Sequence, residues 1–83
     1  VLRFVEVKGR AKGAATVTVS RNEMLCGLTN PEQFILAIVE VDGDKTRTIY
    51  LKKPAFDAPG LATASTNYDI MDLIASAEIV YQK

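Results

Sequence analysis

The sequence predicts a layered α+β (α/β) domain, in which two helices pack on a mixed or antiparallel sheet of about four strands. Three observations support this fold class: short runs of β-branched residues with the two-residue period of strands, an apolar run at residues 34–41, and two segments with helix-start signals. The length of 83 residues suits one small domain, and 48% hydrophobic with 24% charged residues is typical of a folded chain. We therefore expect residues 1–83 to form a single domain.

The first two predicted strands span residues 2–9 and 15–19. Alternation along the first strand places Glu6 and Lys8 on one face, together with the apolar Phe4. The segment between the strands, GRAKGA, begins with one glycine and contains a second, which favours a turn. We therefore expect the two strands to form an antiparallel hairpin.

The segment SRNE predicts the start of the first helix, because Ser20 and Glu23 have the spacing of a capping box. The helix continues through MLCGL, and Gly27 should keep it short because glycine disfavours helix. Asn30 and Pro31 then carry a second helix-start signal, from which we expect one short turn.

The apolar run at residues 34–41 is hydrophobic at positions that would face both sides of a sheet, which predicts a central strand covered on both faces. The DGD segment at residues 42–44 follows it and predicts a hairpin turn, because Asp-Gly tolerates positive φ angles. Residues 46–51 are rich in β-branched and aromatic side chains, so we expect them to return as the next strand.

The last part of the chain predicts a loop followed by a helix. Residues 52–60 contain two prolines and a glycine, which favour a loop. Residues 65–80 have apolar side chains at helical spacing and acidic residues near the beginning, so we expect one helix with Asn67 or Ser65 as its N-cap.

The composition excludes several kinds of site. Ten basic and ten acidic residues give a net charge of zero, so no broad basic surface is expected. Because histidine is absent and Cys26 is the single cysteine, the chain offers neither a zinc site nor a histidine-assisted nucleophile, and any metal should be an oxygen-bound ion such as Mg²⁺. We expect Cys26 to be a buried structural thiol. Apolar runs are too short for a membrane span and no signal-peptide pattern occurs, so we expect a cytoplasmic protein without a membrane partner.

Glu6 and Lys8 are the candidate catalytic residues. On spacing alone, a weak solvent-exposed ion pair is the commoner explanation of two such residues on one strand face. The alternative is a metal-dependent phosphodiester site, which needs a carboxylate to hold Mg²⁺ and a cation to orient the nucleophile or to stabilise charge at phosphorus. The pair lies just before Gly9, at a strand end, where sites tend to form.

The order of FVEVKGR, TVTVSRNEM and an apolar strand resembles the C-terminal domain family named after the plant protein NO VEIN. In that family an I-E-V-K-G strand, a second strand and an S-x-N-E helix start follow one another, and the resemblance covers the first half of this chain. The family has no known function, occurs at the end of large bacterial helicase-like and restriction-associated proteins, and is similar to PD-(D/E)xK nucleases. The resemblance implies a partial restriction-endonuclease-like fold, DNA as the partner, and helicase or ATPase domains in the same parent chain.

The resemblance also implies roles for three residues. Glu6 and Lys8 correspond to the (D/E)xK half of the nuclease motif, so Glu6 and the backbone carbonyl of Val7 would bind Mg²⁺ and Lys8 would position the attacking water. The aspartate of the PD half normally lies on the preceding strand, which this chain lacks. We therefore expect an excised C-terminal fragment of a larger protein, carrying half a site and inactive alone.

Five further residues are candidates for contacts with nucleic acid: Arg10, Lys12, Arg21, Asn22 and Glu23. The three basic ones would form a small rim for phosphates, although a solvated loop is the commoner explanation of each residue taken singly. Asn22 and Glu23 lie where nuclease-like folds often place a polar residue that faces the site from the following helix, and helix capping is the alternative for Glu23.

Two functions stay open at this point: a nuclease-like domain, or a non-catalytic module that binds nucleic acid or protein and is attached to a helicase. An exposed sheet edge would serve the second function, including an edge-strand dimer of two copies. Tyr50, Tyr68 and Tyr81 are scattered in the sequence, so we expect them in packing rather than in a base-stacking platform. Lys52 and Lys53 should be exposed at a strand end.

Overall fold

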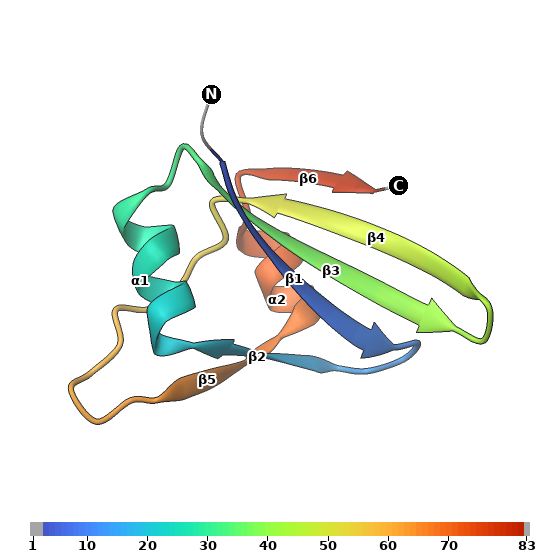
Figure 1. The fold of residues 1–83 in the computed structure, drawn as a ribbon, viewed down its shortest axis with the longest axis horizontal. Helices are drawn as coiled ribbons and strands as arrows, with labels where there is room; N and C mark the ends of the chain where they lie inside the picture. Colours follow the sequence, from blue (N-terminus) through green and yellow to red (C-terminus); the bar gives the residue numbers. More distant parts are fainter. Residues whose placement is uncertain (1–2, 83) are drawn as a thin grey trace.

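The structure is a computed structural model that describes residues 3–82. In chain order its elements are β1 (Phe4–Ala11), β2 (Thr16–Ser20), α1 (Arg21–Thr29), β3 (Phe34–Asp42), β4 (Lys45–Lys52), β5 (Ser65–Asp69), α2 (Ile70–Ser76) and β6 (Ile79–Gln82). The predicted fold class is confirmed, because a four-stranded mixed sheet packs with two helices (Figure 1). The expected first strand began at Leu2, which lies outside the described residues.

The four-stranded sheet has the order β1-β3-β4-β6, with β1 parallel to β3 and the other neighbours antiparallel. The predicted hairpin of β1 and β2 is wrong, because β2 pairs with β5 in a separate two-stranded antiparallel sheet. The connection turns at Gly13, whose φ is 84°, and sends β2 away from β1. The pairing with β5 lets Val17 and Val19 become almost fully buried, at 2% and 0% exposure, and this burial favours β2 in the second layer.

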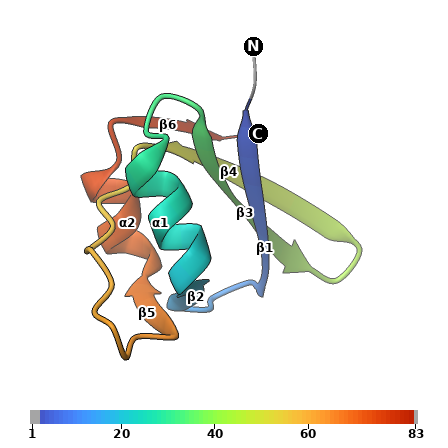
Figure 2. The ribbon, with the colours of Figure 1, turned by 60° about the vertical axis from the view of Figure 1, so that its left-hand side comes forward.

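One face of the four-stranded sheet is covered and the other is not. Figure 2 shows α1, α2 and the small sheet on the same side of the large sheet. The core lies between these layers and consists of Val17, Val19, Met24, Phe34, Leu36, Ile38, Ile49, Leu51, Phe56 and Leu73. The position of β3 between β1 and β4 is confirmed, but no element of residues 3–82 covers its second face, where Ile35 and Val39 stay partly exposed.

The predicted start of α1 is confirmed. Ser20 is the N-cap, its hydroxyl accepts from the N–H of Glu23 at 3.2 Å, and the Glu23 carboxylate accepts from the N–H of Ser20 at 2.7 Å. The helix ends at Asn30, whose carbonyl accepts from the N–H of Phe34 at 2.9 Å and so closes the predicted short turn. A Cβ at Gly27 would lie 3.0 Å from the ring of Phe56, so glycine here permits close packing of the later loop on α1.

The single helix predicted for residues 65–80 is wrong. Strand β5 precedes α2 and strand β6 follows it, so only Ile70–Ser76 is helical. The N-cap is Asp69, whose side chain accepts from the N–H of Asp72 at 3.0 Å, and not Asn67 or Ser65. Asn67 instead bonds Thr18 across the small sheet at 2.5 Å, a long-range contact that the sequence pattern does not reveal.

The hairpin turn between β3 and β4 is confirmed, and Gly43 in it has a φ of 63°. The expectation of a freely exposed Lys53 is wrong, because its ammonium contacts Glu32 at 2.6 Å and Glu78 at 3.2 Å and its side chain is 28% exposed. These partners raise the pKa of Lys53, and Lys53 lowers the pKa of Glu32. Lys52 is also partly covered. Within residues 3–82, no helix has both the length and the apolar character that crossing a membrane requires.

Candidate functional site

Glu6 and Lys8 share a face of β1, as the alternation predicts. Their register partners on β3 are Leu36 and Ile38, which are buried in the core, so the pair lies on the covered face of the sheet. The Glu6 side chain is 36% exposed and the Lys8 side chain 21%. The pair therefore sits at the rim of the core and is not a fully solvated strand face.

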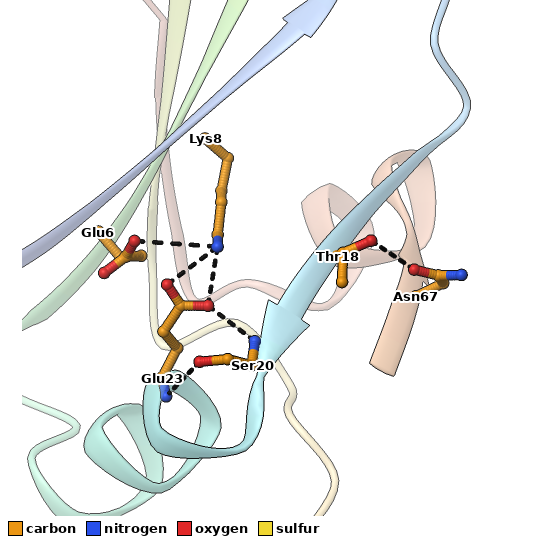
Figure 3. A network of polar contacts seen from close by, with 6 residues as sticks. All are labelled: Glu6, Lys8, Thr18, Ser20, Glu23 and Asn67. Carbon is orange, nitrogen blue, oxygen red and sulfur yellow. Dashed lines mark hydrogen bonds and ion pairs between the residues drawn. The ribbon is translucent and has the colours of Figure 1, made fainter. Parts of the chain in front are cut away.

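The ammonium of Lys8 is held between two carboxylates. Its Nζ lies 2.8 and 2.9 Å from the two oxygens of Glu23, and 3.8 Å from the nearer oxygen of Glu6 (Figure 3). Glu23 also caps α1 through Ser20, so the helix cap and the strand pair form one network. Both motifs are visible in the sequence, but their contact is not, because Lys8 and Glu23 are 15 positions apart and nothing local signals that they meet.

The network shifts the pKa values of the two carboxylates in opposite directions. Partial burial alone would raise the pKa of Glu23, but hydrogen bonds from Glu6, Lys8 and Ser20 outweigh it and lower the pKa from 4.5 to about 2. The pKa of Glu6 is raised, first because its protonated form can donate a hydrogen bond to Glu23, and then by burial and by the like charge of Glu23. Of the two carboxylates, Glu6 is the less well compensated, because its contact with the Lys8 ammonium, at 3.8 Å, is longer than that of Glu23.

A hollow of about 450 Å³ adjoins this network. Its lining includes Arg3, Phe4, Glu6, Asn22, Glu23 and Cys26. The structure places Asn22 and Glu23 beside Glu6, and it adds Arg3, which strand alternation assigns to the opposite face of the predicted first strand. The expectation of a buried Cys26 is not met, because its side chain is only partly buried.

The other three predicted basic residues lie elsewhere. Lys12 contacts Asp42 at 3.3 Å, beyond the end of β1. Arg21 donates a hydrogen bond to the carbonyl of Gly60. Arg10 lines a different hollow, and none of the three lines the one beside Glu6.

The outer edge of β1 has no neighbouring strand within residues 3–82. The N–H of Phe4 donates to the carbonyl of Gln33, just before β3, at 3.0 Å, and the N–H of Lys12 donates to the carbonyl of Val41 in β3 at 2.9 Å. Because backbone groups alternate along a strand, the carbonyls of Val5 and Val7 point to the free edge. The side chains of these valines are 53% and 59% exposed. A free backbone acceptor therefore lies next to Glu6.

The residues present fit only part of a Mg²⁺ site. Among residues 3–82, no three histidine, cysteine, aspartate or glutamate side chains converge as metal ligands. Both oxygens of Glu23 already accept hydrogen bonds, which leaves the Glu6 carboxylate and the Val7 carbonyl as donors. Mg²⁺ in proteins keeps several waters and is usually held by one or two carboxylates, so a second free carboxylate would complete the set.

Comparison with known proteins places the chain in a family. No curated protein and no solved structure matches the chain. A family model described as "Protein NO VEIN, C-terminal" matches residues 1–51, which contain β1, β2, α1, β3 and nearly all of β4. The match includes Glu6, Lys8 and Glu23 and spans more than half of the 83 residues. The chain therefore belongs to the family described as Protein NO VEIN, C-terminal.

Proposed function

We propose that this domain is the nuclease-like part of a larger DNA-processing protein, of the helicase-linked or restriction-associated kind, and that it carries half of a Mg²⁺-dependent phosphodiesterase site. The observation that carries the proposal is the Lys8 ammonium, which is held 2.8 Å from Glu23 and 3.8 Å from Glu6 beside a hollow. A cation fixed next to an uncompensated carboxylate suits phosphoryl chemistry, because one group can orient water while the other holds the metal. The similarity of the sequence motif to PD-(D/E)xK nucleases supports the same assignment.

Each residue then has a distinct role. Glu6 and the carbonyl of Val7 hold Mg²⁺, and Lys8 positions the water that attacks phosphorus. Glu23 is a positioning residue, since its bidentate contact fixes the Lys8 ammonium and its Ser20 contact fixes Glu23 itself. Asn22 lies on the wall of the hollow, where its amide can contact a phosphate oxygen.

The basic residues farther along the chain act on the DNA backbone in this proposal. Arg10 and Lys12 lie at the end of β1, and Arg21 lies at the start of α1. They are too dispersed to form one phosphate site, so each contributes a separate, sequence-independent contact. Helicase or ATPase domains of the same parent chain would deliver the DNA.

The missing carboxylate is supplied by a further strand of the parent chain. The free edge of β1 offers unpaired backbone groups at Val5 and Val7, and a strand that pairs there lies directly beside Glu6. An aspartate on the covered face of that strand would complete the ligand set. For this reason we expect the isolated chain to be inactive and the parent protein to cleave DNA.

One observation favours a second candidate function. Lys8 is already neutralised by Glu23, and no three acidic groups converge in the described part of the chain. A domain that had lost catalysis would look the same. It would serve as a non-catalytic nucleic-acid-binding or protein-interaction module attached to a helicase. The edge of β1 would then be open to a second copy or to another strand.

Nicking of supercoiled plasmid DNA by the parent protein in Mg²⁺ or Mn²⁺ tests the proposal. The variants are Glu6→Gln and Lys8→Ala, and Lys45→Ala is the matched control, because Lys45 is an exposed strand lysine distant from the network. We expect nicking by wild type and Lys45→Ala and its loss in the other two. Calorimetric titration with Mn²⁺ should show binding that Glu6→Gln abolishes.

The two functions give opposite results. If wild type and all variants leave the plasmid intact and Mn²⁺ does not bind, the catalytic proposal is refuted and the binding module stands. If Lys45→Ala loses activity as completely as Lys8→Ala, the effect is not specific to the network. Circular dichroism spectra of the variants must match wild type for either conclusion.

A further inference from the structure

The uncovered face of the four-stranded sheet presents a second hollow, of about 440 Å³. It lies on the side opposite the helices, as Figure 2 shows for the sheet as a whole. The pairing register places two rows of side chains on this face: Val5, Ile35, Lys52 and Ile79 in one row, and Val7, Ala37, Tyr50 and Tyr81 in the next. The face is therefore built from all four strands.

Two tyrosines lie side by side in this hollow. Tyr50 on β4 is the register partner of Tyr81 on β6, and their ring centroids are 6.1 Å apart with planes inclined by 39°. Tyr81 is 59% exposed. The two tyrosines thus pack against each other, and they also leave an exposed aromatic surface that is assembled from distant parts of the chain.

The charges around the tyrosines have one sign. Arg3 and Lys52 line the hollow, and none of the side chains that line it is acidic. The acidic side chains Glu32 and Glu78, which belong to segments next to β3 and β6, are both in contact with Lys53. Glu32 also feels the charge of Lys52, so it lies near one of the two cations. An aromatic pair beside two basic side chains is complementary to an anion that carries flat apolar groups.

We propose that this outer face binds single-stranded nucleic acid, with bases stacked on Tyr81 and Tyr50 and phosphates held by Arg3 and Lys52. Base stacking on aromatic side chains within a basic groove is the general chemistry of single-strand recognition. The two cations that line the hollow favour an anionic occupant over an uncharged or basic protein surface. A duplex hides the faces of its bases, so it cannot use the tyrosines.

Arg3 lines both hollows, but Tyr50, Lys52 and Tyr81 line only the outer one. The proposal does not depend on catalysis, because Glu6 and Lys8 lie on the opposite face of the sheet. Binding at the outer face would hold an unwound strand on the domain. It predicts a preference for single strands that the Glu6 site alone does not predict.

Fluorescence anisotropy of a fluorescein-labelled twelve-residue oligothymidylate tests the proposal with the isolated chain at low salt. Tyr81→Ala should weaken binding roughly tenfold, because one stacked base is lost, whereas Tyr81→Phe keeps the ring and should stay within about twofold. Arg3→Gln and Lys52→Gln should each lower the slope of log K against log salt by about 0.7. Lys45→Gln is the control cation and should leave the slope unchanged.

Several results would overturn the proposal. The first two are equal affinity for a duplex of the same length and unchanged affinity of Tyr81→Ala for the oligonucleotide. The third is light scattering that shows a wild-type dimer and a Tyr81→Ala monomer, which would make the face a contact between two copies. Weakened binding in Glu6→Gln or Lys8→Ala would assign the oligonucleotide to the covered face instead. If the wild-type parent protein does not nick plasmid DNA while the isolated chain still binds the oligonucleotide, only the proposed nuclease function is refuted.

Discussion

Replacing Glu23 with glutamine separates the two tasks of this side chain. Glutamine keeps an oxygen that can accept from the N–H of Ser20, so the capping box survives. It removes the charge that holds the Lys8 ammonium at 2.8 and 2.9 Å. The change in stability therefore reports the ion pair and not the helix cap.

The magnitude follows from the pKa of Glu23, which folding lowers from 4.5 to about 2. At 1.36 kcal/mol per unit, this shift corresponds to about 3 kcal/mol of stability at neutral pH. The opposite shift of Glu6, whose pKa is raised chiefly by its neighbour Glu23, offsets part of it, so we expect Glu23→Gln to lose about 2 kcal/mol. For a domain of this size that loss lowers Tm by roughly 8–16 °C.

The sign of the pH dependence is fixed by the same shift. A lowered carboxyl pKa stabilises the fold above pH 4.5 and loses this effect as the pH falls towards about 2. The difference between wild type and Glu23→Gln, measured by urea unfolding followed by circular dichroism, should therefore be full at pH 7 and shrink between about pH 5 and 2. Glu40→Gln is the matched control, because Glu40 lies 3.9 Å from Arg47 in a more open pair, and it should cost at most about 0.5 kcal/mol. A difference below 0.5 kcal/mol at pH 7, or one that does not change with pH, would refute this account of the network.

Three further changes test the fold by thermal or urea unfolding. Asp69→Ala removes the N-cap of α2 and should cost about 1 kcal/mol; an unchanged midpoint would contradict the assigned cap. Leu73→Ala should cost about 2–5 kcal/mol, because Leu73 is only 2% exposed. Met71 lies on the same helix and is 70% exposed, so Met71→Ala should change the stability by at most about 0.5 kcal/mol. Similar losses in both variants would contradict the position of the core. Gly27→Ala should destabilise the fold by about 1 kcal/mol or more, because the added methyl group would lie 3.0 Å from the Phe56 ring. This overpacking outweighs the gain in helix propensity. A stabilised variant would show that the ring is free to move.

Local signals in the sequence predicted the parts of the fold that depend on neighbouring residues. The Ser20–Glu23 box marks the start of α1 because each side chain satisfies a backbone N–H within one turn. Gly43 marks the β3–β4 hairpin because its φ of 63° is easy only for glycine and a few polar residues. Alternation along β1 placed Glu6 and Lys8 on one face. None of these inferences needs knowledge of a distant partner.

The parts that failed depend on partners far away in the sequence. The pattern of residues 65–69 is compatible with a helix start, and only pairing with β2 makes it a strand. The parallel pairing of β1 with β3 competes with a local hairpin and wins because β3 is the most apolar strand of the chain. Lys8 meets Glu23 across 15 residues of sequence, and the pairing of β4 with β6 brings Tyr50 beside Tyr81. The candidate site and the outer face were therefore only half visible in the sequence.

The network also limits which carboxylate can serve a metal. One oxygen of Glu23 accepts from both Ser20 and Lys8, and the other accepts from Lys8. A metal bound by Glu23 would have to displace the ammonium and leave a 21% exposed cation without its closest partner. Glu6 is held less tightly, since its contact with the Lys8 ammonium is the longer one at 3.8 Å. Its pKa is raised first by the hydrogen bond with Glu23 and then by burial and by the like charge of Glu23, which an arriving cation would offset. Under the proposed function, the carboxylate that folding leaves least compensated is therefore the one best prepared to bind Mg²⁺, and Glu23 serves by holding Lys8 in place.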